Sequence, residues 1–238
     1  AQMVNMENHK AMFESFVGAQ SNGMLMWMSQ SAWPSTVWQT YDYYLDQTAG
    51  YYGCKKALEP LHILWDSQLD KVKVANNTRQ GYKNLIAEVL MLRDSVRLDS
   101  GSDTVTDCMS IVYPKKLSPV HFIKLELKDG NKIIADNFYW RGNEYQEYSD
   151  LSNMFPANLQ YSLYWEKSGG KVFLTVDIKN VGKNIALMTR LKVLRDRSKE
   201  RVLPVYYSDN YFSLLPGETK QVILEFNAKD LQGENPVL

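Results

Sequence analysis

The sequence predicts a mainly β chain, in which an α/β fragment over residues 1–60 is followed by two antiparallel β-sandwiches. Residues 4–19 carry apolar side chains at helical spacing, and residues 24–28 are an apolar run. From about Leu61 the period of the apolar residues changes from 3.6 to 2, which indicates strands. Turn signals then recur between strand-like segments up to the C-terminal end, as they do in sandwiches.

The first 60 residues are typical of an α/β repeat. A helix is predicted over 4–19, where apolar positions alternate with Glu7 and Glu14, which are expected on exposed faces. Ser21-Asn22-Gly23 breaks the helix, and Met24–Met28 reads as a strand that is apolar on both faces, as in parallel sheets covered by helices. A second, weaker helical stretch lies within 39–60. A single strand of this kind needs partner strands, because its backbone groups are otherwise unpaired.

The first sandwich is predicted from alternating segments. Lys71–Ala75 and Leu85–Leu92 are strand candidates, and Val120–Leu127 and Lys132–Trp140 flank Asp129-Gly130-Asn131. This tripeptide is a strong hairpin signal, because glycine accepts the positive φ of tight turns.

Residues 141–160 are polar and irregular and are interpreted as a linker. A second sandwich follows, beginning with the clear alternation of Lys171–Lys179. Ile185–Leu194 and Gln221–Phe226 continue it, and Leu215-Pro216-Gly217-Glu218 fits a turn with proline and glycine at its central positions.

Composition excludes several classes of function. The chain has 27 Lys and Arg against 27 Asp and Glu, so its charge gives no reason to expect nucleic acid or an anionic membrane as a partner. No apolar stretch reaches the roughly 20 residues of a membrane helix, and residues 1–10 do not resemble a signal peptide. Cys54 and Cys108 lack metal-type spacing, and we expect two free thiols, with one disulfide as the alternative.

Motifs for cofactors and metals are also missing. The sequence has no GxGxxG, no P-loop and no GxSxG, so we expect no cofactor and no hydrolase triad of that type. His9, His62 and His121 lie far apart, and no metal site is predicted.

Aromatic residues are concentrated between residues 27 and 52. Packing is the simpler explanation, because large rings bury much area. The alternative is a sugar platform, in which indoles stack on the C–H faces of a pyranose while neighbouring amides and hydroxyls bind its rim. Trp27, followed by Ser29, Gln30 and Ser31, combines both kinds of group at the end of the predicted strand, which is where α/β barrels hold their active sites.

At these residues the chain resembles the family 2 glycoside hydrolases, and most closely the branch of the exo-β-glucosaminidases and mannosylglycoprotein endo-β-mannosidases. GMLMWMSQSAWPSTVWQTYDYYLDQTAGYYGCKKALEPLHI, at 23–63, is similar to the eighth barrel strand and the segment after it. NMENHKAMFESF at 5–16, NFYW at 137–140 and LPVYYSDNYFSLLPGET at 203–219 resemble further blocks in the same order.

The resemblance implies two immunoglobulin-like β-sandwiches preceded by the α/β C-terminal end of a (β/α)8 barrel. The implied domains are the barrel end at 1–60, the first sandwich at 61–142 and the second sandwich, with its linker, at 143–238. Members hydrolyse β-glycosides with retention, using two glutamates on barrel strands upstream of Ala1. No catalytic residue is therefore expected in this chain.

The same resemblance assigns candidate sugar-binding residues. Trp27 is expected to stack beneath the sugar, and Trp33 to line the edge of the site. Gln30 and Ser31 stand where the glucosaminidase branch tends to have asparagines, a departure that leaves the sugar open. The more distant rings, Trp38, Tyr43 and Tyr44, are expected to serve packing.

The predicted function is that of a supporting C-terminal segment of an exo-β-glycosidase for β-glucosaminides or β-mannosides, inactive alone. Its implied partners are a carbohydrate substrate and the N-terminal remainder of the polypeptide, and the family implies secretion or a periplasmic location. A non-catalytic carbohydrate-binding or adhesion module is the alternative, and a natural subunit cleaved from a precursor is a third reading.

Overall fold

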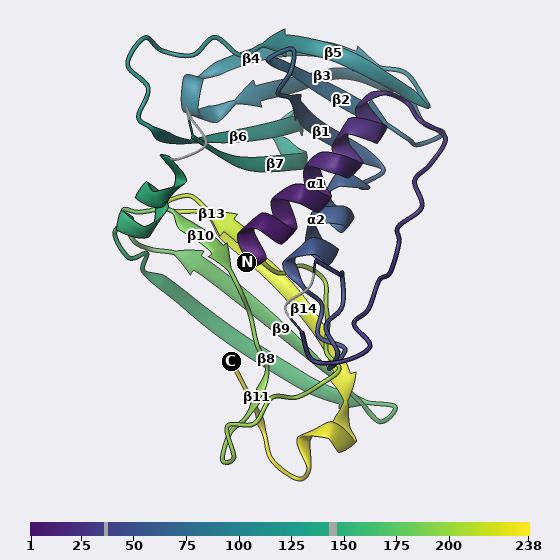
Figure 1. The fold of residues 1–238 in the computed structure, drawn as a ribbon, viewed down its shortest axis with the longest axis vertical. Helices are drawn as coiled ribbons and strands as arrows, with labels where there is room; N and C mark the ends of the chain where they lie inside the picture. Colours follow the sequence, from purple (N-terminus) through teal and green to yellow (C-terminus); the bar gives the residue numbers. More distant parts are fainter. Residues whose placement is uncertain (36–37, 143–146) are drawn as a thin grey trace. The chain divides into compact units, whose positions relative to one another are not determined.

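The computed structural model describes residues 1–35, 38–142 and 147–238, and within them the chain is mainly β with antiparallel sheets (Figure 1). It divides into two compact units. Unit 1 consists of Ala1–Glu7, Trp27–Tyr52 and Phe155–Leu238, and unit 2 of Asn8–Met26 and Gly53–Met154. The mainly β class and the antiparallel sheets are as predicted from the alternation.

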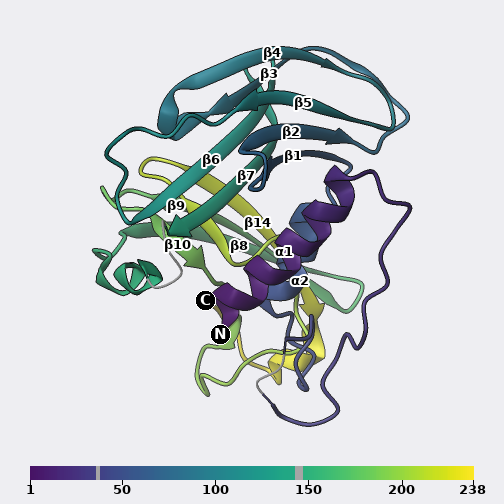
Figure 2. The same ribbon diagram turned by 45° about the horizontal axis from the view of Figure 1, so that its top comes forward.

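Unit 2 contains a sandwich of two sheets, with strand orders β1-β2-β5 and β4-β3-β6-β7, which appear as two layers in Figure 2. Its strands are β1 Leu61–Asp66, β2 Lys71–Asn76, β3 Tyr82–Val89, β4 Asp94–Ser100, β5 Thr104–Ser110, β6 Val120–Asp129 and β7 Lys132–Gly142. Short 3-10 helices η1 Leu90–Leu92 and η2 Glu147–Asn153 complete it, so the strand predicted to reach Leu92 ends at Val89.

Alternation places the core of this sandwich as predicted. Val72 and Val74 of β2 are fully buried and share one hydrophobic cluster with Leu85, Leu125 and the other inward residues of both sheets. The predicted hairpin joins β6 to β7, where Asp129 pairs with Lys132 and Gly130 has a φ of 58°. A side chain at that φ is disfavoured, so glycine fits this turn.

Unit 1 holds the second group of strands. They are β8 Leu159–Ser168, β9 Lys171–Asn180, β10 Ala186–Thr189, β11 Leu194–Arg195, β12 Tyr206–Tyr207, β13 Phe212–Leu214, β14 Thr219–Asn227 and β15 Pro236–Val237, with the 3-10 helix η3 Ala228–Leu231. The main sheet has the order β12-β14-β9-β8, and the pairs β10-β13 and β11-β15 form two small sheets.

The core of unit 1 follows the predicted pattern of β9. The residues of one face are buried, namely Val172, Leu174, Val176 and Ile178, and they cluster with inward residues of β13 and β14. The turn at 215–218 forms as predicted, with the amide of Glu218 donating to the carbonyl of Leu215 at 3.1 Å and Gly217 at a φ of 86°.

Two α-helices precede the strands, α1 Gln2–Gly18 and α2 Ala49–Ala57. The first confirms the predicted helix, but the expectation that its apolar positions are buried is wrong in part. Polar residues of α1 are buried, namely Asn5, His9, Lys10 and Glu14, whereas Val4, Met12 and Phe16 are exposed. Three of these side chains are hydrogen-bonded to other parts of their own unit: Asn5 to Thr48, Lys10 to Asn137 and Glu14 to His62.

The strand predicted at Met24–Met28 is not formed. The segment is irregular, Leu25 is completely exposed and Trp27 is 77% exposed. A strand that is apolar on both faces needs neighbours on both edges, and no strand in the described ranges pairs with it. The α/β element expected here is therefore present as a helix and an exposed apolar segment.

The remaining expectations concern the linker and the cysteines. Residues 143–146, inside the predicted linker, lie outside the described residues; the linker region contains η2, and β8 begins at Leu159. Both thiols are free, as expected, and burial raises the pKa of Cys54 to about 11 and of Cys108 to about 12. These thiols are therefore poor nucleophiles at neutral pH.

Candidate functional site

The predicted sugar-binding residues lie in unit 1, in a stretch that we call the aromatic segment, residues 27–48. Thr36 and Val37, within it, are outside the described residues. Its large rings face solvent: Trp27 is 77%, Trp33 68% and Trp38 52% exposed. Tyr43 and Tyr44 are also exposed, so the expectation that Trp38 and these two tyrosines serve packing is wrong for the described structure.

The polar residues that accompany the tryptophans are divided between surface and interior. Gln30 is exposed, and its backbone forms a parallel bridge with Tyr41. Ser31 is buried, and its hydroxyl donates to the side-chain oxygen of Gln39. The structure therefore brings residues 29–31, which we call the strip, against residues 39–41. Only Gln30 of this pair presents its side chain to solvent.

Further buried hydrogen bonds support this strip. The amide of Tyr41 and the hydroxyl of Thr40 both donate to the carbonyl of Ser29, at 2.9 and 3.0 Å. The Thr48 hydroxyl donates to the Gln39 carbonyl at 2.7 Å, and Asn5 of α1 donates to the Thr48 oxygen at 3.1 Å. Each such bond contributes about 1 kcal/mol, and a buried group left without one costs more. The strip is thus fixed from its buried side.

An ionic clamp fixes the end of the segment. One carboxylate oxygen of Asp46 accepts hydrogen bonds from Arg190, at 2.5 Å, and from Arg201. Asp46 is buried, whereas both arginines are partly exposed. Two cations on one buried carboxylate compensate its desolvation, so the clamp ties the aromatic segment to the strand-bearing part of the same unit.

A tight turn precedes the clamp. One carboxylate oxygen of Asp42 accepts the backbone amides of Tyr44 and Asp46, at 2.8 and 2.9 Å, while Leu45 takes a φ of 64°. The turn presents Tyr43 and Tyr44 as a T-shaped pair, with centroids 5.2 Å apart and an interplanar angle of 86°. The turn is therefore rigid, and it displays two rings at right angles.

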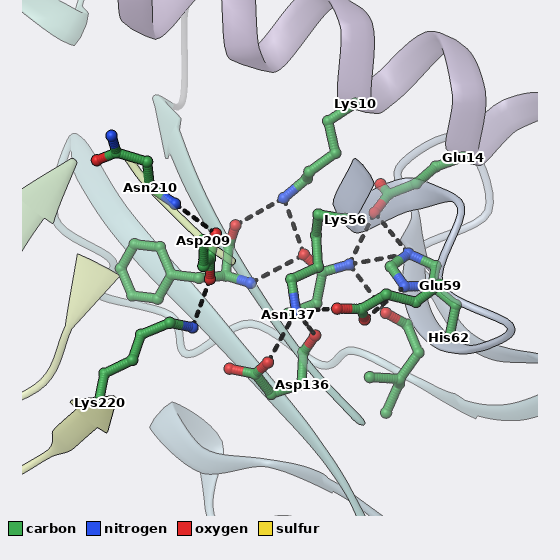
Figure 3. Close-up of polar contacts among 12 residues, drawn as sticks. Lys10, Glu14, Lys56, Glu59, His62, Asp136, Asn137, Asp209, Asn210 and Lys220 are labelled. Atoms are coloured by element: carbon green, nitrogen blue, oxygen red, sulfur yellow. Dashed lines mark hydrogen bonds and ion pairs between the residues drawn. The ribbon is translucent and has the colours of Figure 1, made fainter. Parts of the chain in front are cut away.

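The second notable cluster, which lies wholly in unit 2, is the Glu14 network (Figure 3). Glu14 is 5% exposed and accepts hydrogen bonds from His62 at 2.9 Å, Asn137 at 2.7 Å and the Tyr139 hydroxyl at 3.0 Å. Lys10, one helical turn before Glu14, donates to the Asn137 side chain at 2.9 Å. The expectation that Glu14 lies on an exposed face is therefore wrong.

Opposite charges in this network determine its ionisation. Burial favours the neutral form of Glu14, but the charge of Lys10 and the bonds from His62 and Asn137 outweigh it and hold the pKa of Glu14 below its ordinary value. Burial likewise disfavours charged His62, yet bonds to Glu14 and Glu59 raise its pKa. Charged forms of both are thus favoured, and the network anchors α1 within unit 2.

A second part of the network joins α2 and the residues after it to β6 and β7. Lys56 pairs with Glu59 and Asp136, each at 2.9 Å, and Lys124 pairs with Asp136 at 2.6 Å. The two lysines hold the pKa of Asp136 well below its usual range, although burial alone raises it. Each of these charged groups has a partner of opposite charge, which indicates a structural use.

The described residues contain no group of three or more His, Cys, Asp and Glu side chains arranged to hold a metal ion. Among the helices of the described ranges, none is long and apolar enough to cross a membrane. The exposed residues of the aromatic segment include its three tryptophans, Tyr43 and Tyr44, together with the polar residues Ser29, Gln30 and Ser35. Aromatic rings beside amides and hydroxyls are chemically suited to stacking and hydrogen bonding with a polar ligand that has apolar faces.

Comparison with known proteins places these features in context. Residues 137–238 match the family described as "Exo-beta-D-glucosaminidase Ig-fold domain". An exo-beta-D-glucosaminidase of Streptomyces avermitilis is 29% identical over 99% of this chain, and the match covers 30% of that relative. A mannosylglycoprotein endo-beta-mannosidase of Lilium longiflorum is 26% identical, over 95% of this chain and 32% of the relative.

The chain is also similar in structure to an enzyme of this kind. The crystal structure of the Amycolatopsis orientalis exo-chitosanase CsxA superimposes with a TM-score of 0.87 at 28% identity, over 99% of this chain and 32% of that one. The chain thus spans about a third of the length of the proteins it matches. The resemblance predicted from the residue blocks is confirmed.

Proposed function

Because the chain is a homologue of the exo-β-glucosaminidases of glycoside hydrolase family 2, we propose that it is the C-terminal segment of a retaining exo-β-glycosidase acting on β-glucosaminides or β-mannosides. In this proposal residues 1–60 complete a (β/α)8 barrel, and residues 61–142 and 143–238 form two immunoglobulin-like sandwiches that support it. Release to the periplasm or the medium is part of the proposal, since polysaccharide substrates lie there.

The observation that carries the proposal is the extent of the matches. They cover nearly all of this chain but only about a third of each relative, as expected for a segment of a longer enzyme. Exposed apolar side chains support it. Leu25 and Trp27 face solvent in the block that is similar to the eighth barrel strand, and Met12 and Phe16 of α1 face solvent on the helix before it. Burying such side chains against the remaining barrel strands would be favourable by about 25 cal/mol for each Å² of apolar area.

We propose that Trp27, Gln30, Ser31 and Trp33 contribute to the sugar subsite. Trp27 and Trp33 are exposed rings that can stack on pyranose C–H faces, and the Gln30 amide offers a donor and an acceptor. Ser31 is buried with Gln39 and acts by holding the strip rather than by touching sugar. Discrimination between an amino sugar and mannose would then rest on Gln30 and on residues outside this chain.

The chemistry itself is assigned to a part of the protein outside these residues. Retaining hydrolysis needs one carboxylic acid to protonate the leaving oxygen and one carboxylate to form the covalent intermediate. Glu14 and Asp136 are used in the buried network and Asp46 in the clamp. This chain therefore binds and orients substrate but does not break the glycosidic bond.

The decisive experiment compares this chain with the full-length protein on aryl β-glucosaminide and aryl β-mannoside. We expect turnover by the full-length protein alone, with the preferred sugar identifying the branch. Turnover by the 238-residue chain at an enzymatic rate would contradict the proposal, since both carboxylates would then lie within it.

One observation favours a second function, that of a non-catalytic carbohydrate-binding module. The edge strand β8 exposes Tyr161 and Leu163 on one face, with Trp165 next along it half-buried, and free-standing modules use exposed rings to bind sugars. If the full-length protein is inactive on both substrates, retention of the chain by chitosan or mannan that is lost in Tyr161→Ala would support this alternative.

A further inference from the structure

We propose that Asp42, Tyr43 and Tyr44 form a second sugar subsite, which binds the neighbouring glucosamine unit of a β-linked chain by its ammonium group and ring face. The inference rests on the proposed function, because that function places the first sugar at Trp27 and Gln30. It adds to that function a second binding position and the three residues that would form it.

The two rings are presented as a binding surface. Tyr43 is 46% and Tyr44 56% exposed, and their right-angled arrangement offers the face of one ring beside the edge of the other. A pyranose can stack its C–H face on such a ring, and an ammonium group is attracted to the electron-rich face of a tyrosine. Mannose and N-acetylated sugars offer the stacking but not the cation.

Asp42 supplies a negative charge beside the rings. One of its carboxylate oxygens is used by the backbone amides of Tyr44 and Asp46, and in the described ranges Asp42 takes part in no ion pair. The arginines of the clamp bind Asp46 instead. The charge of Asp42 is thus available to a cationic ligand, which favours a free amine over a neutral sugar.

The position of the turn suits a neighbouring sugar unit. Tyr41 is bridged to Gln30, and its amide binds the carbonyl of Ser29 at 2.9 Å. Tyr44 lies three residues further on, so at most about 10 Å of chain separates it from Tyr41. The aromatic pair is therefore close to the strip that holds Gln30, within reach of the sugar attached to one bound there.

Preorganisation completes the argument. The amide of Asp42 donates to the carbonyl of Asp46 at 3.0 Å, and the Asp46 carboxylate is held by Arg190 and Arg201. A turn closed at its base by these contacts presents its rings without an ordering cost on binding. Asp46 is in this sense a positioning residue for the second subsite.

The test uses the full-length protein and two substrates that differ in length. Methyl β-glucosaminide presents one sugar ring, and a glucosamine tetramer reaches a second subsite. For the double variant Tyr43→Ala/Tyr44→Ala we expect KM for the tetramer to rise about tenfold, the equivalent of losing one good contact, with little change on the methyl glycoside. Asp42→Asn keeps the oxygen that accepts both amides, and we expect a smaller rise that disappears in high salt.

Two controls separate binding from folding. Tyr206→Ala, which removes an exposed tyrosine elsewhere in unit 1, should match wild type on both substrates. Tyr43→Phe/Tyr44→Phe retains both rings, so its KM for the tetramer should lie well below that of the double alanine variant. Equal losses on both substrates would show a structural role and overturn the inference, and an unchanged KM for the tetramer would show that no second subsite exists here.

Failure of the proposed function gives a different result. If wild-type protein hydrolyses neither substrate, the affinities of the same proteins for glucosamine and N-acetylglucosamine tetramers decide the inference. Tighter binding of the glucosamine tetramer by wild type, lost in Asp42→Asn, would support the subsite. Equal binding of the two tetramers by wild type would overturn it.

Discussion

The aromatic segment and the Glu14 network both bury polar side chains, yet they differ in what those side chains hold. In the network, carboxylates and cations pair with one another around a ring, Tyr139, that is itself buried. In the segment, Ser31, Thr48 and Asp46 are buried, whereas tryptophans and tyrosines of the same segment face solvent. The first arrangement fixes a helix, and the second fixes a surface.

The contrast shows how a buried polar group can be assigned a role. Buried charges are a weak source of net stability, because desolvation offsets their attraction, but they allow few alternative arrangements. Where all partners are internal, as around Glu14, their removal should affect folding. Where the polar groups support exposed rings, as at Asp46, their removal should affect the position of those rings as well.

The largest expected effect follows from Glu14→Ala. This change removes the buried carboxylate that faces Lys10 and His62, and we expect a loss of about 3–5 kcal/mol in the free energy of unfolding. Urea denaturation of the chain measures it. Met12→Ala, an exposed change on the same helix, should stay within about 0.5 kcal/mol. A loss for Glu14→Ala no larger than that of Met12→Ala would contradict the network's role.

Asp46→Asn is expected to have a smaller effect on stability. Arg190 and Arg201 are each about a third exposed, so solvent screens the lost attraction and we expect a cost of about 1–2 kcal/mol. The comparison predicts an additional local consequence, namely faster proteolysis within residues 38–48. Asp209→Asn, which removes a single ion pair to Lys220 in the same unit (Figure 3), should leave that proteolysis rate unchanged.

His62 should make the stability contributed by the Glu14 network depend on pH. Its pKa is raised above the ordinary 6.5, so its stabilising contribution is complete below pH 6.5 and is lost as pH rises through the folded-state pKa. Glu14, whose pKa is lowered from 4.5, acts in the opposite sense, and its contribution is lost as pH falls below that value. We expect the urea midpoint to decline on both sides.

The variant His62→Gln isolates the alkaline side of this profile. It retains a hydrogen-bond donor toward Glu14 but does not titrate, so the decline above pH 6.5 should flatten while the acid decline remains. A profile with an unchanged alkaline slope would show that the proton is bound elsewhere.

Much of the β structure was predictable because apolar and polar residues alternate along its strands. Residues 172–178 alternate inward and outward along β9, and Asp129-Gly130-Asn131 is a strong signal for the hairpin turn that joins β6 to β7. The helix α1 was predictable as a helix, but its buried face was not. Lys10 and Glu14 are buried through partners more than 40 residues away in the sequence, which no periodicity reports.

The candidate site divides in the same way. The residue types at Trp27, Gln30 and Trp33 indicated a sugar platform, and their exposure is compatible with it. The clamp was not predictable, because Arg190 and Arg201 lie 144 and 155 residues from Asp46. The strand at Met24–Met28 was mispredicted because an apolar run forms a strand only where other strands pair with it.

The smallest expected effect on stability is that of Trp27→Ala. The indole is 77% exposed, so its removal should change the free energy of unfolding by no more than about 0.5 kcal/mol. If the aromatic segment is a binding surface, the same change should reduce the affinity of the full-length protein for glucosaminide or mannoside at least tenfold, equivalent to about 1.4 kcal/mol. Calorimetric titration of wild type and variant measures this, with Met91→Ala, an exposed apolar residue of unit 2, as the matched control.

Unchanged stability together with lost affinity would separate the two regions by role, since no side chain of the Glu14 network is expected to combine these outcomes. Lost stability with unchanged affinity would instead make Trp27 a packing residue covered in the full-length protein, and the contrast between the two regions would disappear.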